Sequence, residues 1–417
     1  MNVKVTPSPL RGKITAIPSK SDAHRLLICS ALADAQTELS LPRTSEDIDA
    51  TIGCLRSLGA KIERDGEILH ITPITNPADS PLLDCAESGS TLRFLLPVAA
   101  ALCESAGFIG SGRLPERPLG QLIGAMEEHE VTFSQEKLPF ATSGKLLSGK
   151  YVLPGNISSQ YITGLLLALP LLAKDSEISL TTRLESSAYV DITLNSLGCF
   201  GVNIERTKNG FFIKGNQRYR SPIRVDVDGD WSNAAFFLCA GAIGGNITLT
   251  GLNADSPQGD RRILEFLRKF GADITESKGA IAVKSLRLVG CEIDIAETPD
   301  LLPALAVVAA FSEGETRFIN ASRLRLKESD RLNSTAAMLN ALGGNATELP
   351  DALIVRGTAL AGGAVDSFHD HRTAMAAAIA GTYCKAPVII TDAGAAAKSY
   401  PSFYEDFAKL GGKVDVV

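Results

Sequence analysis

The chain has 417 residues, 45% hydrophobic and 21% charged, which is typical of a soluble globular protein long enough for two domains. Its formal net charge of -6 argues against a nucleic-acid-binding protein held by bulk electrostatics. The sequence does not open with a cationic segment followed by an apolar run, so we expect no signal peptide. The apolar stretch 162–173 is too short to span a membrane. The eight cysteines are scattered without a C-x-x-C pair, so we expect reduced thiols and a cytoplasmic location.

A unit of about 70 residues recurs six times along the chain. Each unit opens with a short polar run, continues as a nearly all-apolar helix, and then reaches a short β-rich strand. The polar openings are Lys20-Ser21, Glu87-Ser88-Gly89-Ser90, Ser158-Ser159-Gln160, Asp230-Trp231-Ser232-Asn233, Pro299-Asp300 and His371-Arg372. The predicted helices include 26–33, 92–102, 162–173 and 301–311, and the strands after them include 38–41, 177–180, 246–249, 316–319 and 388–390.

The second half of each unit is predicted to be an amphipathic helix, as the spacing of Ile48, Ile52, Leu55 and Leu58 indicates. In five of the six units this helix is expected to end at a glycine, because glycine adopts the left-handed conformation that a C-cap needs. These glycines are Gly59, Gly198, Gly271, Gly343 and Gly411. Further strands are predicted at 61–63, 202–204, 272–274 and 413–415, so the repeat is close to βαβαββ.

The apolar helices also predict how the repeats are arranged. A helix that is apolar on all sides is buried on all sides, so we expect the strands to enclose these helices. Three units closed around such helices make a body of about 200 residues, a normal domain size, and six units make two bodies. The division is expected near 224–230, and the pattern leaves open which body the leader 1–14 joins.

The segment 327–331, Lys-Glu-Ser-Asp-Arg, is the most specific stretch, and it lies at the predicted start of a helix that runs to about Leu342. Ser329 or Asp330 can cap that helix. Two cations and one carboxylate at its positive end favour an anion site with a proton-transfer group beside it. For this segment alone, a capped surface helix with ordinary salt bridges is the alternative.

Polar and charged side chains that could bind a ligand or take part in chemistry gather at helix starts throughout the chain. First-helix starts carry Lys20, Ser21, Arg25, Ser158, Ser159, Gln160, Asp300, His371 and Arg372, and second-helix starts carry Arg117, Ser186, Tyr189, Lys327, Glu328, Arg331 and Lys398. If parallel helices point the same way, these groups share one face of each body, and two such faces would attract a multiply charged anion. The cluster His369-Asp370-His371 lacks a recognisable third ligand, so no metal site is expected.

Six stretches of the sequence, in this order, resemble the 5-enolpyruvylshikimate-3-phosphate synthase family of enolpyruvyl transferases. They are Pro18-Ser19-Lys20-Ser21 with Arg25, Glu116-Arg117-Pro118, Ser158-Ser159-Gln160, residues 325–331, Asp370-His371-Arg372 and Lys398-Ser399-Tyr400-Pro401. The resemblance implies an α/β fold of two inverse α/β domains, each of three βαβαββ repeats with buried helices and outer sheets. The implied N-terminal domain spans 15–227 on the shikimate-phosphate side. The C-terminal domain joins 1–14 to 228–417 on the phosphoenolpyruvate and catalytic side.

The implied reaction transfers the enolpyruvyl group of phosphoenolpyruvate to the 5-hydroxyl of shikimate 3-phosphate by addition and elimination, releasing phosphate, in aromatic amino acid biosynthesis. The resemblance implies no metal or organic cofactor, no nucleic-acid or membrane partner, and a monomer. The alternative enzyme is UDP-N-acetylglucosamine enolpyruvyl transferase, which is expected to have Lys-Asn at Lys20-Ser21 and a cysteine within 113–117. The alternative of another class is a non-enzymatic ring or scaffold protein. Such a protein would be expected to have a basic inner stripe, and the negative net charge of the chain argues against it.

The resemblance also implies substrate contacts for matched residues. For shikimate 3-phosphate these are Ser21, Arg25, Ser158, Ser159, Gln160, Ser186, Tyr189 and Lys327. For phosphoenolpyruvate they are Lys20, Gly89, Arg117, Arg331, Arg372 and Lys398, and His371 and Arg323 complete the substrate-binding set.

Three residues are implied as catalytic. Asp300 is the base at the 5-hydroxyl, and Lys20 and Glu328 move protons at the methylene carbon and the bridging oxygen. Such groups contribute about 10²–10⁴-fold each, and the sequence leaves open which takes which step. Two positions depart from the family pattern, since Glu87 and Arg323 both stand where Asn is frequent. Sensitivity to glyphosate-type analogues therefore stays open.

Overall fold

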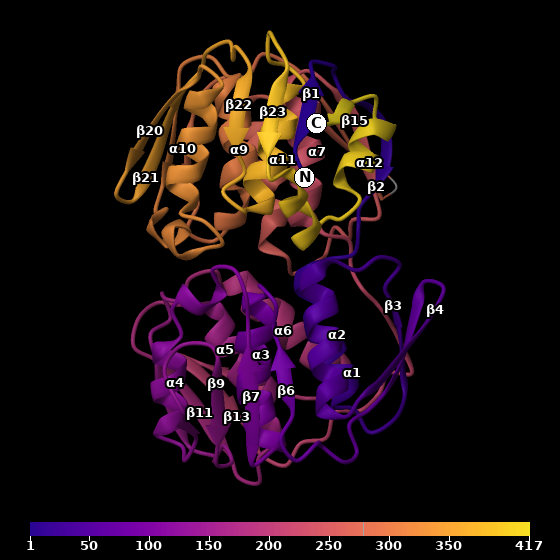
Figure 1. Ribbon diagram of the computed structural model, residues 1–417, viewed down its shortest axis with the longest axis vertical. Coiled ribbons are helices and arrows are strands. Elements are labelled where there is room, and N and C mark those ends of the chain that lie inside the picture. The colour runs from indigo at the N-terminus through magenta and orange to yellow at the C-terminus, as the bar shows by residue number, and fades with distance from the viewer. Residues whose placement is uncertain (278) are drawn as a thin grey trace. The chain divides into compact units, whose positions relative to one another are not determined.

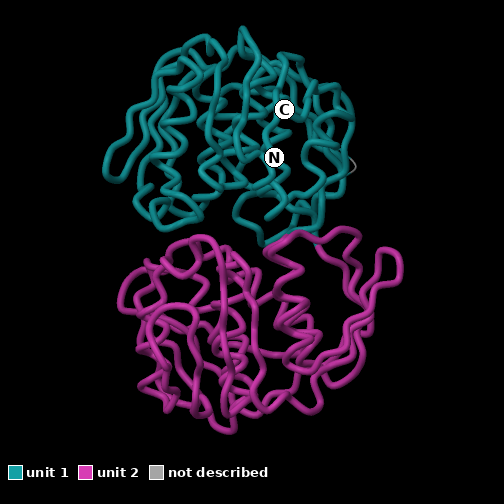
Figure 2. The backbone as a smooth tube through the Cα atoms, viewed as in Figure 1, with its two compact units in different colours: residues 1–19, 228–417 teal, residues 20–227 magenta. Residues whose placement is uncertain are grey.

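The computed structural model describes residues 1–277 and 279–417, in which the chain divides into two compact units (Figure 2). Unit 1 combines Met1–Ser19 with Asp228–Val417, and unit 2 is the continuous segment Lys20–Val227. Within unit 1 the two chain crossings lie side by side, because Ser19 N donates to Asp228 O at 2.7 Å and Pro18 bridges Gly229. No helix of the described residues is both long and apolar enough to cross a membrane.

Unit 2 contains three repeats of one strand and helix pattern. The first comprises α1 (Lys20–Ala31), β3 (Thr37–Ser40), α2 (Glu46–Leu58), β4 (Lys61–Asp65) and β5 (Ile68–Thr72). The second comprises β6 (Leu82–Asp84), α3 (Gly89–Leu102), β7 (Ser105–Ile109), α4 (Gly120–Glu127), β8 (Thr132–Phe133) and β9 (Phe140–Ser143). The third comprises β10 (Lys150–Leu153), α5 (Ser159–Ala168), β11 (Ser176–Leu180), α6 (Ser187–Cys199), β12 (Ile204–Thr207) and β13 (Gly210–Ile213), and β14 (Arg224–Asp226) follows.

Unit 1 repeats the pattern with two strands from its N-terminal segment, β1 (Val3–Thr6) and β2 (Arg11–Thr15). Its first repeat comprises α7 (Trp231–Ile243), β15 (Asn246–Thr250), α8 (Ile263–Phe270), β16 (Asp273–Ser277) and β17 (Ala280–Lys284). The next comprises β18 (Glu292–Asp294), α9 (Leu302–Ala310), β19 (Glu315–Ile319), α10 (Arg331–Ala341), β20 (Asn345–Leu349) and β21 (Ala352–Arg356). The last comprises β22 (Gly363–Asp366), α11 (His371–Gly381), β23 (Val388–Thr391), α12 (Phe403–Lys409) and β24 (Lys413–Val416).

Six four-stranded sheets share one topology, with one parallel pair followed by two antiparallel pairs (Figure 1). Unit 2 has the orders β14-β3-β5-β4, β6-β7-β9-β8 and β10-β11-β13-β12. Unit 1 has β2-β15-β17-β16, β18-β19-β21-β20 and β22-β23-β1-β24. In three sheets a strand distant in sequence completes the pattern: β14 and β2 supply the parallel edge strand, and β1 supplies the third strand. Each sheet is thus one βαβαββ repeat, and the two strands of the leader both lie in unit 1.

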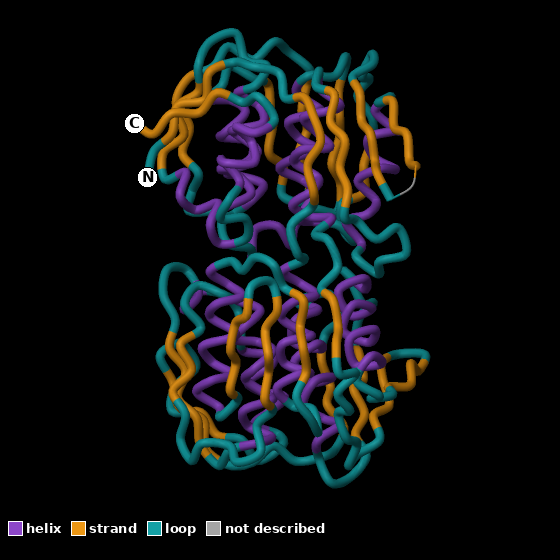
Figure 3. The backbone as a smooth tube through the Cα atoms, turned by 90° about the vertical axis from the view of Figure 1, so that its right-hand side faces the viewer, coloured by secondary structure: helices purple, strands orange, loops and turns teal. Residues whose placement is uncertain are grey.

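The first helices of the repeats are buried, as their all-apolar sequences predict. Every residue of α9 and of α11 is buried, and in each unit the strands lie outside the helices (Figure 3). In unit 2 the helices α1, α2, α3, α5 and α6 pack in a closed ring, each against the next. In unit 1, α7, α9 and α11 pack against one another. The predicted enclosure of the helices by the strands is confirmed.

The predicted glycine caps are confirmed in four of the five repeats. Gly59 and Gly271 are left-handed C-caps with φ of 115° and 102°, and Gly343 and Gly411 take φ of 82° and 90° one residue past the cap. The prediction for Gly198 is wrong: α6 runs through it, and Gly201 takes the left-handed conformation with φ of 72°. The strand predicted at 202–204 therefore begins later, at Ile204.

Two predicted helices also differ in extent. The helix predicted at 162–173 ends at Ala168 and is followed by a 3-10 turn, Leu169–Leu171, because Pro170 cannot continue the α-helical hydrogen bonds. The helix predicted at 26–33 begins earlier, at Lys20, so Lys20, Ser21 and Arg25 all lie in its first two turns.

Candidate active site

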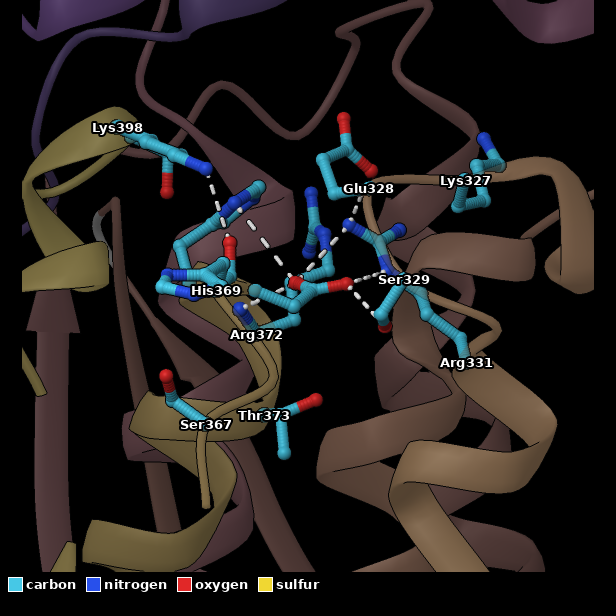
Figure 4. A network of polar contacts seen from close by, with 12 residues as sticks. Lys327, Glu328, Ser329, Arg331, Ser367, His369, Arg372, Thr373 and Lys398 are labelled. Atoms are coloured by element: carbon cyan, nitrogen blue, oxygen red, sulfur yellow. Dashed lines mark hydrogen bonds and ion pairs between the residues drawn. The ribbon is translucent and has the colours of Figure 1, made fainter. Parts of the chain in front are cut away.

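In unit 1 the predicted site residues converge on the buried side chain of Arg331, which is 1% exposed (Figure 4). Its Nε donates to Asp370 Oδ2 at 2.7 Å, its Nη1 to Asp300 Oδ1 at 2.7 Å and its Nη2 to Glu328 Oε2 at 2.7 Å. Burial alone would lower the pKa of Arg331, but the carboxylates of Asp370, Glu328 and Asp300 outweigh it and raise the pKa above its ordinary value. The guanidinium is therefore a fixed positive charge that holds three carboxylates together.

Two helix caps place this cluster. Asp330 caps α10 and accepts from Asn333 N at 3.2 Å, which decides between the two predicted caps. Ser329 instead donates from Oγ to Asp370 Oδ2 at 2.9 Å. Asp370 caps α11 and accepts from Arg372 N at 2.9 Å, so the first turns of α10 and α11 share one buried carboxylate. Burial would raise the pKa of Asp370, but the charge of Arg331 lowers it to about 2.

Asp300 lies in the 3-10 turn Pro299–Leu301 that leads into α9. Besides Arg331 it pairs with Lys327, whose Nζ is 3.4 Å from Oδ1, and with Arg372, whose Nη2 donates to Oδ2 at 3.2 Å. Burial would raise the pKa of Asp300, but the charges of Arg372, Lys327 and Arg331 hold it well below its ordinary range. Asp300 is therefore a carboxylate held in its ionised form.

Lys327 and Glu328 are the partly accessible members of the cluster, with side chains 23% and 21% exposed. Burial lowers the pKa of Lys327, and Asp300 opposes that change. Arg323 is half-buried on the preceding 3-10 turn, close enough for its charge to lower the pKa of Lys327 as well. Figure 4 shows Glu328 and Arg331 pointing toward each other from the start of α10.

The remaining candidates of unit 1 gather at the start of α11. Lys398 ends the 3-10 turn Ala393–Lys398 and donates from Nζ to His369 O at 2.9 Å. His369 Nδ1 lies 2.6 Å from Asp392 Oδ2, and the buried His371 places Nδ1 3.8 Å from Asp370 Oδ1. All eight predicted residues of unit 1 thus lie at helix or 3-10 starts, or within the turns that lead to them.

In unit 2 the start of α1 carries Lys20, Ser21 and Arg25. Lys20 Nζ lies 2.8 Å from Asp47 Oδ2 at the start of α2. Arg25 is 2% exposed, and its Nε donates to Thr193 Oγ1 at 2.8 Å while its Nη1 donates to Ser21 O at 2.5 Å. Burial lowers the pKa of Arg25 to about 10.

The start of α3 brings Gly89 against two arginines. Ser88 caps the helix and accepts from Thr91 N at 3.2 Å. A Cβ at Gly89 would lie 2.5 Å from Arg93 Nη1 and 2.6 Å from Arg117 Nη1, closer than real Cβ contacts allow. The absence of a side chain at Gly89 thus lets both guanidinium groups approach the helix start.

The starts of α5 and α6 carry the predicted serine cradle. Ser158 caps α5 and accepts from Gln160 N at 3.3 Å, while the Gln160 amide donates from Nε2 to Ser90 Oγ at 3.0 Å. Ser159 is 5% exposed in the first turn of α5. Ser186 is a buried left-handed residue with φ of 54° before α6, and its carbonyl accepts from Tyr189 N at 3.1 Å. A non-glycine residue in this conformation is uncommon, and such residues cluster at functional sites.

Four buried residues of these sites were missed by sequence reasoning. The sequence identifies Asp370 only as part of the motif Asp370-His371-Arg372, and it gives no signal for Asp47 or Asp260 as site residues. Arg93 had a signal, since it is a lone cation in the otherwise apolar sequence of α3, and it donates to Pro118 O at 2.8 Å and Gln160 Oε1 at 3.3 Å. Burial and the charge of Asp300 raise the pKa of Asp260 to about 6.

Comparison with known proteins identifies the family of the chain. The family model for EPSP synthase, 3-phosphoshikimate 1-carboxyvinyltransferase, matches residues 5–407. The chain belongs to the EPSP synthase family. Curated relatives named 3-phosphoshikimate 1-carboxyvinyltransferase include one from Clostridium kluyveri, 45% identical over 99% of this chain and 98% of the relative. Another, from Clostridium perfringens, is 46% identical over 98% of each chain.

Solved structures match the whole EPSP synthase fold. EPSP synthase from Acinetobacter baumannii is similar with a TM-score of 0.84 and 26% identity over 100% of both chains. The enolpyruvyl transferase NikO from Streptomyces tendae shares the fold with a TM-score of 0.81, at 17% identity, over 99% of this chain and 98% of NikO. The predicted fold class, two inverse α/β domains of βαβαββ repeats, is confirmed.

As a member of the EPSP synthase family the chain is an enolpyruvyl transferase of the shikimate pathway, as the sequence predicted. The alternative, UDP-N-acetylglucosamine enolpyruvyl transferase, is less supported, because the family model and both relatives carry the shikimate activity in their names.

Proposed function

We propose that unit 2 recognises shikimate 3-phosphate and that unit 1 supplies the acid-base chemistry with which phosphoenolpyruvate reacts. The reaction adds the 5-hydroxyl of shikimate 3-phosphate to the enol carbon and then eliminates phosphate. The two units differ from the predicted domains, 15–227 and 1–14 plus 228–417, only in residues 15–19, which lie in unit 1. The observation that carries it is Asp300, an ionised carboxylate between Lys327, Arg331 and Arg372.

For shikimate 3-phosphate, the proposal assigns the phosphate to the helix starts of α5 and α6. Ser158, Ser159 and Ser186 offer hydroxyl and backbone N–H groups there, where the helix dipole favours an anion. Arg25 and Ser21 take the carboxylate and a hydroxyl at the start of α1, with Gln160 and Tyr189 beside the ring. Lys327 is assigned to the hydroxyl that reacts.

For phosphoenolpyruvate, the proposal assigns six groups: Lys20, Gly89 and Arg117 from unit 2, and Arg331, Arg372 and Lys398 from unit 1. His371 and Arg323 complete the binding set. Asp370 already satisfies Nε of Arg331, so a ligand carboxylate competes with Glu328 for Nη2. That exchange would release Glu328 as a proton-transfer group at the moment the ligand arrives.

Asp300 is proposed as the base that accepts the 5-hydroxyl proton. It is ionised at neutral pH, as a base must be, and Lys327 next to it stabilises the developing alkoxide. Lys20 and Glu328 are proposed to deliver and remove the proton at the methylene carbon and at the bridging oxygen. The order of those two roles is left to kinetics.

Phosphate release from the two substrates by the purified protein tests this proposal. We expect phosphate only when shikimate 3-phosphate and phosphoenolpyruvate are both present, with UDP-N-acetylglucosamine failing to replace the former. Release with the UDP-sugar and not with shikimate 3-phosphate would overturn the assignment in favour of the alternative transferase.

A further inference from the structure

A continuous line of polar groups links three helices of unit 2 just inside their N-termini. His24 Nδ1 of α1 lies 2.7 Å from Thr51 Oγ1 of α2, which lies 2.7 Å from Thr91 Oγ1 of α3. Thr91 Oγ1 is 2.7 Å from Ser88 Oγ, the cap of α3, and 3.3 Å from Asp47 O at the start of α2. We call His24, Thr51, Thr91 and Ser88 the hydroxyl chain.

The hydroxyl chain is fully buried, since all four of its residues are 0% exposed. Burial, with the charges of Lys20 and Arg25, lowers the pKa of His24 well below its ordinary value, so the imidazole is neutral. A neutral imidazole has one donor and one acceptor nitrogen, and each threonine hydroxyl both donates and accepts. Each contact along the line can therefore be a hydrogen bond, and the protonated nitrogen of His24 decides whether Nδ1 donates to Thr51 or accepts from it.

The hydroxyl chain reaches groups assigned to phosphoenolpyruvate through two of its members, Ser88 and Thr91. At one end Ser88 caps the helix whose first residue is Gly89, next to Arg93 and Arg117. Thr91 donates from Oγ1 to the carbonyl of Asp47, whose carboxylate lies 2.8 Å from Lys20 Nζ. A shift of α3 relative to α1 and α2 would thus change the distance between Gly89 and Lys20.

The next residue of α1 makes the corresponding link on the other side. Arg25 Nε donates to Thr193 Oγ1 of α6 at 2.8 Å, and Thr193 Oγ1 is 2.9 Å from Thr163 Oγ1 of α5. Those two helices begin at the serine cradle assigned to the shikimate phosphate. Two adjacent residues of one buried helix therefore tie different halves of the helix ring, His24 toward α2 and α3, and Arg25 toward α5 and α6.

A purely structural role is the simple alternative, because buried polar groups usually pair with one another. Such a role predicts lower stability and no preference between substrates. Buried hydroxyl groups are not needed merely to fill space, since valine has nearly the shape of threonine without its hydrogen-bonding requirement. Their placement one turn below helix starts that carry substrate groups favours a positioning role.

We propose that His24 is a positioning residue for phosphoenolpyruvate, acting through Thr51 and Thr91 to hold Gly89 and Lys20 in register. This inference rests on the proposed function, which assigns Gly89 and Lys20 to that substrate. It adds that the two substrates are positioned by separate polar links that diverge from His24 and Arg25 of α1.

The test compares His24→Leu and Thr51→Val with His24→Asn, whose amide keeps a polar atom near the Nδ1 position. Loss of the link should raise KM for phosphoenolpyruvate about tenfold, the factor that corresponds to one net hydrogen bond. The dissociation constant of shikimate 3-phosphate, measured by calorimetry without the second substrate, should stay within about twofold. His24→Asn should recover most of the affinity for phosphoenolpyruvate.

Thr163→Val supplies the reciprocal measurement, since it should weaken shikimate 3-phosphate and spare phosphoenolpyruvate. Thr142→Val is the matched control, because Thr142 is equally buried but lies on β9 and donates to Ala106 O. It should change neither substrate. Thermal unfolding of every variant separates a loss of stability from a loss of position.

A parallel weakening of both substrates, or a lower melting temperature with both affinities intact, would overturn the positioning role. If His24→Leu fails to fold, Thr51→Val carries the same comparison. Absence of phosphate release by the unaltered protein would remove the proposed function and this inference together. Normal turnover without the split between substrates would remove the inference alone.

Discussion

The two units bury an arginine at a helix start in opposite ways. Arg331 of unit 1 is surrounded by Asp370, Asp300 and Glu328, and its pKa is raised. Arg25 of unit 2 hydrogen-bonds to threonine hydroxyls and to the carbonyls of Ser21 and Tyr189, and burial lowers its pKa to about 10. One guanidinium is paired with three carboxylates, while the other donates hydrogen bonds to neutral groups, and the charge of Asp22 opposes only part of the effect of burial on its pKa.

This difference matches the work proposed for each unit. A charge held by neutral groups still seeks an anion, so the frame around Arg25 suits binding a carboxylate of the substrate. A charge compensated by carboxylates keeps those carboxylates ionised and fixed, so the frame around Arg331 suits proton transfer. The fold is the same in both units, so the proposed division of tasks depends on which side chains stand at their helix starts.

The largest expected effect separates chemistry from binding. Asp300→Ala and Lys20→Met should each lower kcat by about 10²–10⁴-fold, because each removes a proposed proton-transfer group. Circular dichroism should show an intact fold. Unchanged kcat in either purified variant would take that residue out of the mechanism and weaken the contrast between the units.

The next effect concerns the stability of the cluster in unit 1 in which carboxylates compensate the charge of Arg331. Asp370→Asn leaves the buried Arg331 without its principal partner, which should destabilise α10 and α11 by about 3–5 kcal/mol. Native-state hydrogen exchange measures this locally, with the amides of α3 and α5 as an internal reference. Glu313→Gln is the control, since its ion pair with Arg287 is exposed and its loss should leave the protection of both units unchanged. Equal loss of protection in both units would contradict the local compensation described here.

A third effect is the acid sensitivity of unit 1. The pKa of Asp370 is about 2 in the folded protein, below the value of about 3.9 expected when unfolded, so the unfolded chain protonates first as pH falls. Its stabilising contribution is fully present above about pH 4, is lost as pH falls toward 2, and is on the order of 2–3 kcal/mol. Urea unfolding of wild type and Asp370→Asn across this range should converge at the acid end. A constant difference would contradict the assignment.

The smallest effect concerns the approach of Arg93 and Arg117 to Gly89 in unit 2. Gly89→Ala should displace Arg93 and Arg117 without straining the backbone, because both are flexible side chains. KM for phosphoenolpyruvate should rise about tenfold while the affinity for shikimate 3-phosphate changes little. Gly53→Ala, in α2 with open space around it, is the matched control. An unchanged KM would show that the approach of the arginines to the helix start is dispensable.

Sequence predicted the repeats and the helix starts well, because hydrophobic periodicity and capping are local properties. It did not reveal Asp370 as a shared acceptor of the unit 1 cluster, since its two partners Ser329 and Arg331 lie at the start of α10 and only the packing of α10 against α11 brings them there. Arg93 was missed for the same reason, as its acceptors lie on the loop at Pro118 and on α5. The two strands of the leader pair with strands more than 200 residues away, which no local pattern encodes.

The placement of β1 determines the order in which the two units can fold during synthesis. Val3 pairs with Ile390 on one side and Val416 on the other, so β1 waits for the last strand to leave the ribosome. At about 5–20 residues per second that wait is roughly 20–80 s, during which Lys20–Val227 has already been made and has everything it needs to condense. In nascent unit 1, β2 meanwhile lacks a partner until β15 is made and β1 until β23 and β24 are made, so the open edges of both strands are exposed to wrong pairing during synthesis.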